Sequence, residues 1–300
     1  MIKAKLRSYK NRPMHLGPYP LEKLSRATSH PDLNAIPSEP ALSFRRPDDP
    51  LSIVNAMQEY QAMLDATRDG LVKRQRAEIP DDLVERSNHI KSFGYYCDAA
   101  MVGICEIPQI ARRDAALENP DVARLANKLQ TMQPKSLAAG IDVIMAGLRE
   151  SMRAPPKECD HHTHAIVFLY DHPRAPFAGE KGTEWLADAT QQRTCLRSME
   201  TAVTLANYIR TLGFEARAHS GAASDIVMSR LAVLAGLATS DGGRLSNPFV
   251  GDGFGLSVIT TTLALAPDAP LAATAKAPLS WKTGTGIHAK SLSNRDPYKR

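Results

Sequence analysis

The chain has 300 residues, of which 43% are hydrophobic and 23% are charged, so it can bury a sizeable core and lacks the composition of a disordered protein. Its formal net charge is +5, but the basic residues are scattered in short groups such as 73–76, so we expect no nucleic-acid binding. The apolar run 256–266 is too short to cross a membrane, and no apolar segment follows the basic N-terminus as a signal peptide requires.

The four cysteines lie far apart, at Cys97, Cys105, Cys159 and Cys195, and form no C-x-x-C pair. This usage is typical of a reducing compartment and gives no disulfide framework. A ferredoxin-type cluster needs a closely spaced run of cysteines. We therefore predict a cytoplasmic protein with no iron–sulfur cluster encoded in this chain.

The first 50 residues are rich in proline and show little periodicity, which predicts an extended N-terminal arm; a disordered tail is the alternative. We expect a folded α+β domain over 51–270 and a tail or linker over 271–300. Several segments have apolar residues at helical spacing next to capping residues, and we expect a helix in each: 51–77, 80–94, 119–132, 136–153 and 184–212, the last ended by Gly213.

Uncharged apolar runs predict buried strands over 99–104, 165–170 and 256–266, and an alternating pattern predicts a half-exposed strand over 214–219.

A cluster of metal-ligating residue types precedes the strand at 165–170: Cys159, His161, His162 and His164. In an extended strand His162 and His164 share a face while His161 points away, so three ligands would need a bend. The spacing is also more compact than that of usual zinc sites. We expect solvated imidazoles at a strand entrance, and no metal.

The stretch 230–266 reads as an apolar helix end, a glycine-rich loop and a buried strand. Glycines allow positive φ or close backbone approach, so a flat ligand could lie against this loop. A tight structural loop that joins the helix to the strand is the alternative.

Three strings carry a family resemblance: AAMVGI at 99–104, ETAVTLANYIRTLGFEARAH at 200–219 and RLAVLAGLA at 230–238. They resemble the cobalamin-dependent reductases that include reductive dehalogenases and epoxyqueuosine reductase. The resemblance is closest to the N-terminal half of the soluble, respiration-independent reductive dehalogenases. It implies a nitroreductase-like fold, a central sheet flanked by helices.

The resemblance also implies an oxidoreductase module that contributes to the reductive removal of halogen from an organohalide, with a catalytic or ferredoxin-like partner domain or subunit. It leaves open whether the chain binds cobalamin or its pocket is vestigial, because residues 238–241 interrupt the glycine-rich string and the cluster cysteines are absent. The candidate cofactor-binding residues are Arg244, Asn247, Gly251, Asp252, Gly253, Phe254 and Gly255. We assign no catalytic residue.

Two other functions stay open at this point: a non-catalytic scaffold or interaction protein with the same fold, and a flavin nitroreductase-type enzyme. A homodimer is also open.

Overall fold

A four-stranded antiparallel sheet forms the centre of the protein in a computed structural model that describes residues 12–131, 158–187 and 189–277. The strands occur in the order β1 (Met101–Glu106), β3 (His164–Asp171), β8 (Phe254–Thr261) and β4 (Ala216–His219). The middle of β3 is buried throughout, as expected for an apolar strand that is covered on both faces. Helices and antiparallel strands together make this an α+β architecture, as predicted; the nitroreductase-like topology stays a prediction.

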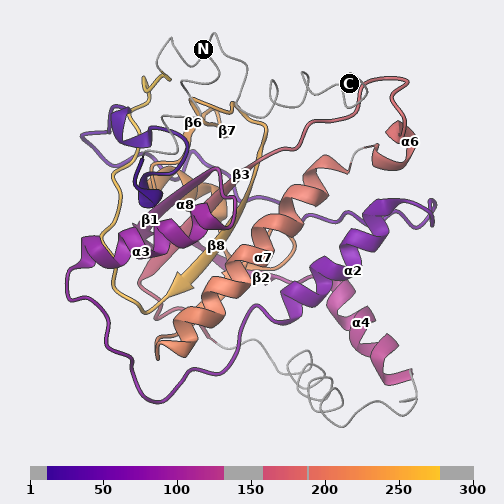
Figure 1. The fold of residues 1–300 in the computed structure, drawn as a ribbon, viewed down its shortest axis with the longest axis horizontal. Helices are drawn as coiled ribbons and strands as arrows, with labels where there is room; N and C mark the ends of the chain where they lie inside the picture. The colour runs from indigo at the N-terminus through magenta and orange to yellow at the C-terminus, as the bar shows by residue number, and fades with distance from the viewer. Residues whose placement is uncertain (1–11, 132–157, 188, 278–300) are drawn as a thin grey trace, which may run out of the picture.

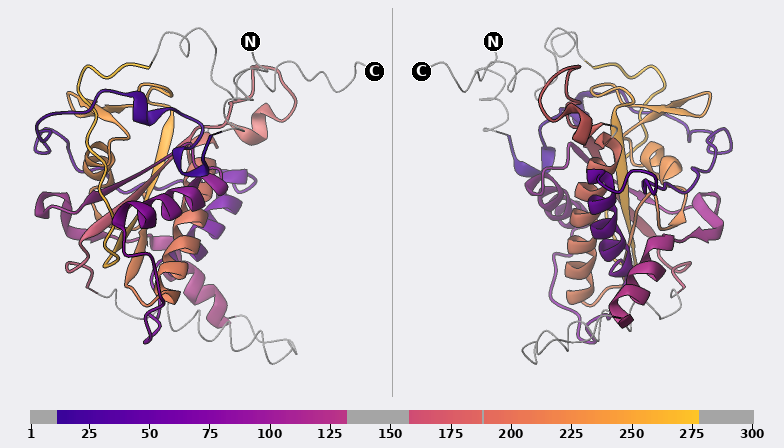
Figure 2. Two further views of the ribbon diagram at one scale, coloured as in Figure 1. Left: turned by 60° about the vertical axis from the view of Figure 1, so that its left-hand side comes forward. Right: turned by 90° about the vertical axis from the view of Figure 1, so that its right-hand side faces the viewer.

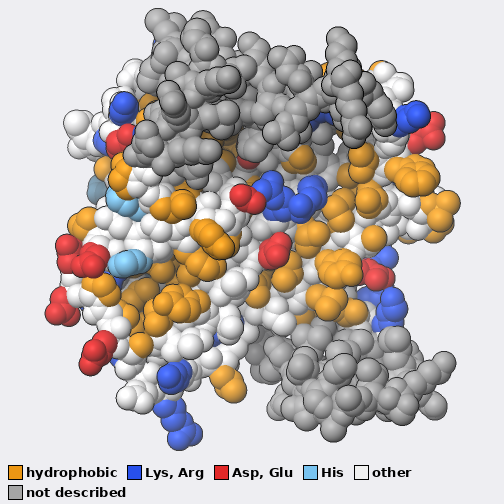
Figure 3. Space-filling view, in the orientation of Figure 1, with side chains coloured by type: hydrophobic (Ala, Val, Ile, Leu, Met, Phe, Trp, Pro, Cys, Tyr) orange, Lys and Arg blue, Asp and Glu red, His pale blue; other side chains and the backbone are white. Residues whose placement is uncertain are grey.

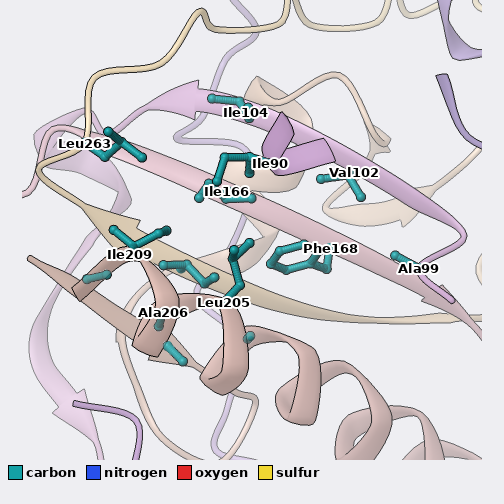
Figure 4. Close-up of a cluster of buried hydrophobic side chains, with 14 of the residues drawn as sticks. Ile90, Ala99, Val102, Ile104, Ile166, Phe168, Leu205, Ala206, Ile209 and Leu263 are labelled. Carbon is teal, nitrogen blue, oxygen red and sulfur yellow. The ribbon is translucent and has the colours of Figure 1, made fainter. Parts of the chain in front are cut away.

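Helices cover both faces of the sheet, which gives three layers. On one face lie α3 (Leu83–Tyr96) and α7 (Thr190–Thr211), and on the other lies α8 (Met228–Leu234). Figure 1 shows α3 and α7 across the sheet, and Figure 2 shows α7 and α8 on opposite sides of its strands. Leu205 and Ile209 of α7 point toward the strands in Figure 4 and are fully buried. Burial of such side chains supplies most of the stabilisation of a helix on a sheet.

The remaining elements surround these layers. Two further helices, α2 (Ile53–Ala66) and α4 (Pro120–Thr131), pack in sequence beyond α7, so that α2 contacts both. The short elements are η1 (Met14–Leu16), η2 (Leu21–Lys23), η3 (Gln109–Ala111), β2 (Arg112–Leu117), α6 (Thr183–Leu186), β5 (Ser224–Ile226), β6 (Thr239–Asp241) and β7 (Arg244–Ser246). On the face shown in Figure 3, acidic and basic side chains are interspersed among hydrophobic ones.

Part of the proline-rich N-terminal segment packs on the α8 side of the sheet. Tyr19, Leu21 and Leu24 are buried in the same cluster as α8. Arg26 forms an isolated antiparallel bridge with Leu271, which brings the expected arm and the expected tail together. The domain boundaries at 50 and 270 stay predictions.

The strand predicted over 165–170 and the helix predicted over 119–132 are confirmed. Gly213 has φ 89°, as expected for a left-handed residue that ends α7. The helix predicted over 136–153 lies outside the described residues.

Several predicted bounds are wrong, each for a local reason. The first helix ends at Ala66 rather than 77, and the helix predicted over 184–212 is broken between α6 and α7. Gly94 does not end α3, which continues to Tyr96. A Cβ at Gly94 would lie 2.7 Å from Val102 and 2.8 Å from Phe168, so the glycine allows the helix to approach the sheet closely.

Three strands also differ from expectation. The strand predicted over 256–266 is β8, which begins at Phe254 and ends at Thr261. The sequence predicted only helices between 108 and 157, but β2 lies there and pairs with β5. The strand at 214–219 is buried along its whole assigned length rather than half-exposed. Its polar residues Arg217 and His219 hydrogen-bond to the half-buried Asp225 and the buried Thr260, so they can be buried, and the alternation of residue type did not predict exposure.

No helix in the described ranges combines the length and the apolar character that a membrane crossing requires.

Candidate functional site

The glycine-rich loop begins with a small β-hairpin. Strand β6 pairs with β7, and Gly242 and Gly243 form the two-residue turn with φ 55° and 85°. Positive φ at both central positions is the requirement of the tight turn that matches strand twist, which explains the two adjacent glycines. Three of the residues 238–241, which interrupt the glycine-rich string, therefore form one strand of this hairpin.

Asn247 is a structural residue of the loop. Its side chain is 2% exposed, and its Nδ2 donates to the carbonyl oxygen of Leu237 at 2.6 Å. Its Oδ1 accepts from the backbone N–H groups of Phe249 at 2.8 Å and Val250 at 3.2 Å. The carboxamide thus satisfies the backbone of the turn that follows and does not face a ligand.

Arg244 and Asp252 form an ion pair across the loop, with side chains that are 78% and 56% exposed. The hydrogen bond from Arg244 lowers the pKa of the Asp252 carboxyl from its ordinary value. Because both groups are exposed to water, the pair contributes little to stability. Arg244 is the one basic side chain among the candidate cofactor contacts, and this ion pair joins it to a residue of the same loop.

The remaining candidates lie at the start of β8. Gly251 has φ 69° and bridges to Asn247, while Phe254 pairs with Asp171 at the end of β3. Gly255 lies within β8, where an added Cβ would meet the Thr194 methyl group at 2.7 Å. That glycine is required by the packing of α7 against β8.

The residues of the glycine-rich loop do not fit a binding site for cobalamin. A Cβ at Gly242 or Gly251 would meet nothing within 4 Å, so the backbone is open, but the side chains of Asn247 and Arg244 are already bonded to other groups of the protein. Nε2 of His172 is a buried polar atom near the loop. It has no hydrogen-bond partner among the residues that the structure describes. The backbone N–H of His172 donates to Gly253 at 2.9 Å, which places it beside the loop. Sequence reasoning did not select this residue.

The histidine cluster is arranged differently from expectation. His161, His162 and Glu215 come together, with one ligand atom from each lying within 4.8 Å of the others, and His164 instead contacts Thr163. The difference arises because β3 begins only at His164, and the backbone N–H of His162 closes a turn onto Cys159 at 3.0 Å. Alternation along a strand therefore does not apply to the first two histidines.

The environment keeps the His162 imidazole neutral. The side chain is 4% exposed, and burial, assisted by the neighbouring His161, lowers its pKa to about 4. Its Nδ1 lies 2.8 Å from the Thr260 hydroxyl. His161 is exposed, and its Nε2 lies 2.6 Å from a carboxylate oxygen of Glu215.

The four cysteines are free thiols, and three of them, Cys105, Cys159 and Cys195, are buried. Burial raises the pKa of the Cys159 thiol, which favours the protonated, inert form. Cys159 thus contributes its carbonyl to the turn beside the histidines rather than a thiolate.

Comparison with known proteins connects this fold to one group of enzymes. No family model and no curated protein matches the chain. A structure of the catabolic reductive dehalogenase NpRdhA is 34% identical, covers 88% of this chain and 31% of that one, and superposes with a TM-score of 0.64. A structure of a reductive dehalogenase described for B12-dependent dehalogenation gives 34% identity, the same coverage and a TM-score of 0.65.

The chain spans about a third of the length of these enzymes. Epoxyqueuosine reductase from Streptococcus thermophilus is 13% identical over 61% of this chain and 48% of its own, with a TM-score of 0.35, which is too low to support an argument.

Proposed function

We propose that this chain, which is related to the reductive dehalogenases, is one module of such an enzyme and contributes to the reductive removal of halogen from an organohalide. The observation that carries the proposal is 34% identity spread over 88% of this chain but over only 31% of the dehalogenase. Identity of that extent supports a shared fold, and the partial coverage supports a part rather than a whole enzyme.

In this proposal the chain is the N-terminal half, similar to a cobalamin domain, and it acts as a scaffold. The cobalamin and the iron–sulfur clusters belong to a catalytic or ferredoxin-like partner domain or subunit. The bonding within the glycine-rich loop supports this division, because Asn247 holds the backbone of the loop and Arg244 is paired with Asp252. A macrocycle at this loop would have to break those contacts or rely on backbone groups alone.

In the same proposal, the rigid parts of the chain position the partner domain or subunit. The sheet is covered on both faces, and its edge strand β4 carries Arg217, which is 3% exposed and paired with Asp69 and Asp225. A dense core and a buried guanidinium held by two carboxylates suit a module that presents fixed surfaces to a partner. Two alternatives remain: an interaction protein unconnected with dehalogenation, and a flavin enzyme of nitroreductase type.

A visible absorption spectrum separates these functions. The chain would be produced with and without hydroxocobalamin, purified, desalted and scanned, with a known cobalamin-binding protein taken through the same steps as a control. The proposal predicts that the control retains the corrinoid and the chain does not. A stoichiometric corrinoid spectrum would show that the chain binds the cofactor itself, and a flavin spectrum would favour the nitroreductase-type enzyme.

A further inference from the structure

We propose that His161, His162 and Glu215 bind a divalent transition-metal ion, with Zn²⁺ as the best-suited ion. The site goes beyond the proposed scaffold role and does not depend on it. Two imidazole nitrogens and one carboxylate oxygen form a ligand set that proteins use for zinc, with a fourth position left for water or substrate.

The distances between the ligand atoms are close to those of a zinc site. Oε2 of Glu215 lies 2.6 Å from Nε2 of His161 and 3.7 Å from Nε2 of His162. Zinc bonds of about 2.0–2.1 Å in a tetrahedron separate the donor atoms by about 3.3 Å. His161 and Glu215 are 51% and 50% exposed, so their side chains can move apart by that small amount.

A hydrogen bond between His161 and Glu215 explains that pair without a metal, but it does not explain His162. The Nε2 of His162 faces the same carboxylate oxygen from 3.7 Å, beyond hydrogen-bond range, although its side chain is 4% exposed. A metal ion placed among the three donor atoms would bond this buried nitrogen together with the two exposed ligands.

The fold holds the backbone of the ligands in place without any ion. The guanidinium of Arg112 donates to the carbonyl oxygens of Cys159 at 3.2 Å and His162 at 2.8 Å, which fixes the turn. The carbonyl oxygen of Glu215 accepts from the Thr261 hydroxyl at 2.6 Å, which fixes Glu215 to the end of β8. Such preorganisation reduces the entropy lost when an ion binds.

A second layer of contacts orients His162. With its Nε2 on a metal, Nδ1 carries the proton and donates to the Thr260 hydroxyl at 2.8 Å. That hydroxyl oxygen lies 2.9 Å from Nε2 of the fully buried His219, and it also accepts from this nitrogen, because Nδ1 of His219 accepts from the backbone N–H of Asp225. Hydrogen bonding of the distal nitrogen is the usual way in which a protein fixes a metal-bound histidine.

A cavity of about 230 Å³ opens beside the ligands. His162 and Glu215 line it together with Glu158 and Arg217, so a metal-bound water would face acidic and basic groups. Arg217 is itself paired with Asp69 and Asp225. The cavity lies at the opposite end of β3 and β8 from the glycine-rich loop, since His164 pairs with Thr261 in this register.

Titration with Zn²⁺ tests the site. The chain would be stripped with EDTA, dialysed and titrated by calorimetry, and Co²⁺ would be added separately as a visible absorption probe. The variants His161→Ala and Glu215→Gln remove ligands that are half-exposed, so both should fold. His89→Ala is the matched control, because His89 is an exposed histidine 3.7 Å from Glu85.

We expect one Zn²⁺ per chain and a visible Co²⁺ spectrum of low-symmetry coordination. Affinity should fall by at least about tenfold in each ligand variant, since even outer contacts of a metal site contribute that much, and should be unchanged in His89→Ala. Absence of saturable Zn²⁺ binding by the folded chain would overturn the proposal. Unchanged affinity in both ligand variants would also overturn it.

Discussion

The carboxylate of Asp225 accepts a hydrogen bond from the guanidinium of Arg68 at 2.9 Å, although the two residues lie 157 positions apart in the sequence. Arg217 donates to the same oxygen at 3.1 Å. Burial by itself raises the pKa of the Asp225 carboxyl, but His219, Arg68 and Arg217 outweigh burial and hold that pKa below its usual value. This cluster ties the segment after α2 to strands β4 and β5.

Replacement of Asp225 by Asn should lower the free energy of unfolding by about 3 kcal/mol at pH 7, because the largely buried guanidinium of Arg68 loses its carboxylate partner and that of Arg217 keeps only Asp69. A carboxyl whose pKa is depressed in the folded state stabilises above its unfolded pKa, and that contribution disappears as the pH falls through the folded pKa. The difference between the variant and the parent should therefore be full above about pH 5 and shrink below the ordinary aspartate value of 3.8.

Urea unfolding at a series of pH values measures this difference. Glu180→Gln is the control, because it removes an exposed ion pair with Arg174 and should cause no measurable change. A difference for Asp225→Asn that stays constant down to pH 3 would contradict the assigned cause.

Gly103 in β1 should not tolerate a side chain. A Cβ there would lie 2.4 Å from the carbonyl oxygen of Ala235, at the end of α8. Gly103→Ala should therefore destabilise the chain by about 1–3 kcal/mol through overpacking. Gly253→Ala is the matched control, because a Cβ there would lie 3.8 Å from the carbonyl oxygen of Val250, an ordinary contact, and the change in stability should stay within about 0.5 kcal/mol. Equal effects in thermal unfolding would show that α8 does not approach β1 this closely.

Asn247 should matter for stability rather than for ligand binding. Asn247→Ala leaves the backbone N–H groups of Phe249 and Val250 without their acceptor, and we expect a loss of about 1–3 kcal/mol. Asn247→Asp keeps the acceptor and loses the donor to Leu237, so it separates the two contributions. Chemical denaturation gives the stability, and a stability equal to that of the parent in both variants would remove the structural role.

Cys105 and Cys195 should resist alkylation in the folded chain. Burial raises the pKa of the Cys195 thiol to about 12 and raises that of Cys105 as well, so neither forms a thiolate at pH 8. Mass spectrometry after iodoacetamide treatment should show both unmodified until denaturant is added. Cys97, which is partly exposed, should react first. Rapid labelling of Cys195 in the folded chain would contradict its burial.

Helices and strands that depend on the local pattern of apolar residues could be predicted from the sequence. The apolar run 165–170 reads as a covered strand because it has no polar face, and α7 reads as a helix from its spacing. The break before α7 and the strand β2 escaped prediction, because β2 is exposed or half-buried along its length and carries no apolar signal. Pairing with β5, rather than local composition, makes it a strand.

The candidate sites illustrate the same limit. The glycine-rich loop could be found in the sequence, but only the contacts of Asn247 distinguish a structural residue from a ligand contact. Glu215 could not be linked to His161 and His162, because their proximity depends on the alignment of β3 and β4 on either side of β8. Register of this kind is decided by the packing of whole strands.

The central claim is that the chain works as a module of a reductive dehalogenase, and the most direct test is to isolate it from its native cells. An antibody against residues of this chain would be used to purify the particle that contains it, followed by analysis of corrinoid, iron and halide release. We predict corrinoid and iron in stoichiometric amounts and dehalogenating activity in that particle. Recovery of the chain without corrinoid or iron, with the activity in fractions that lack it, would contradict the account.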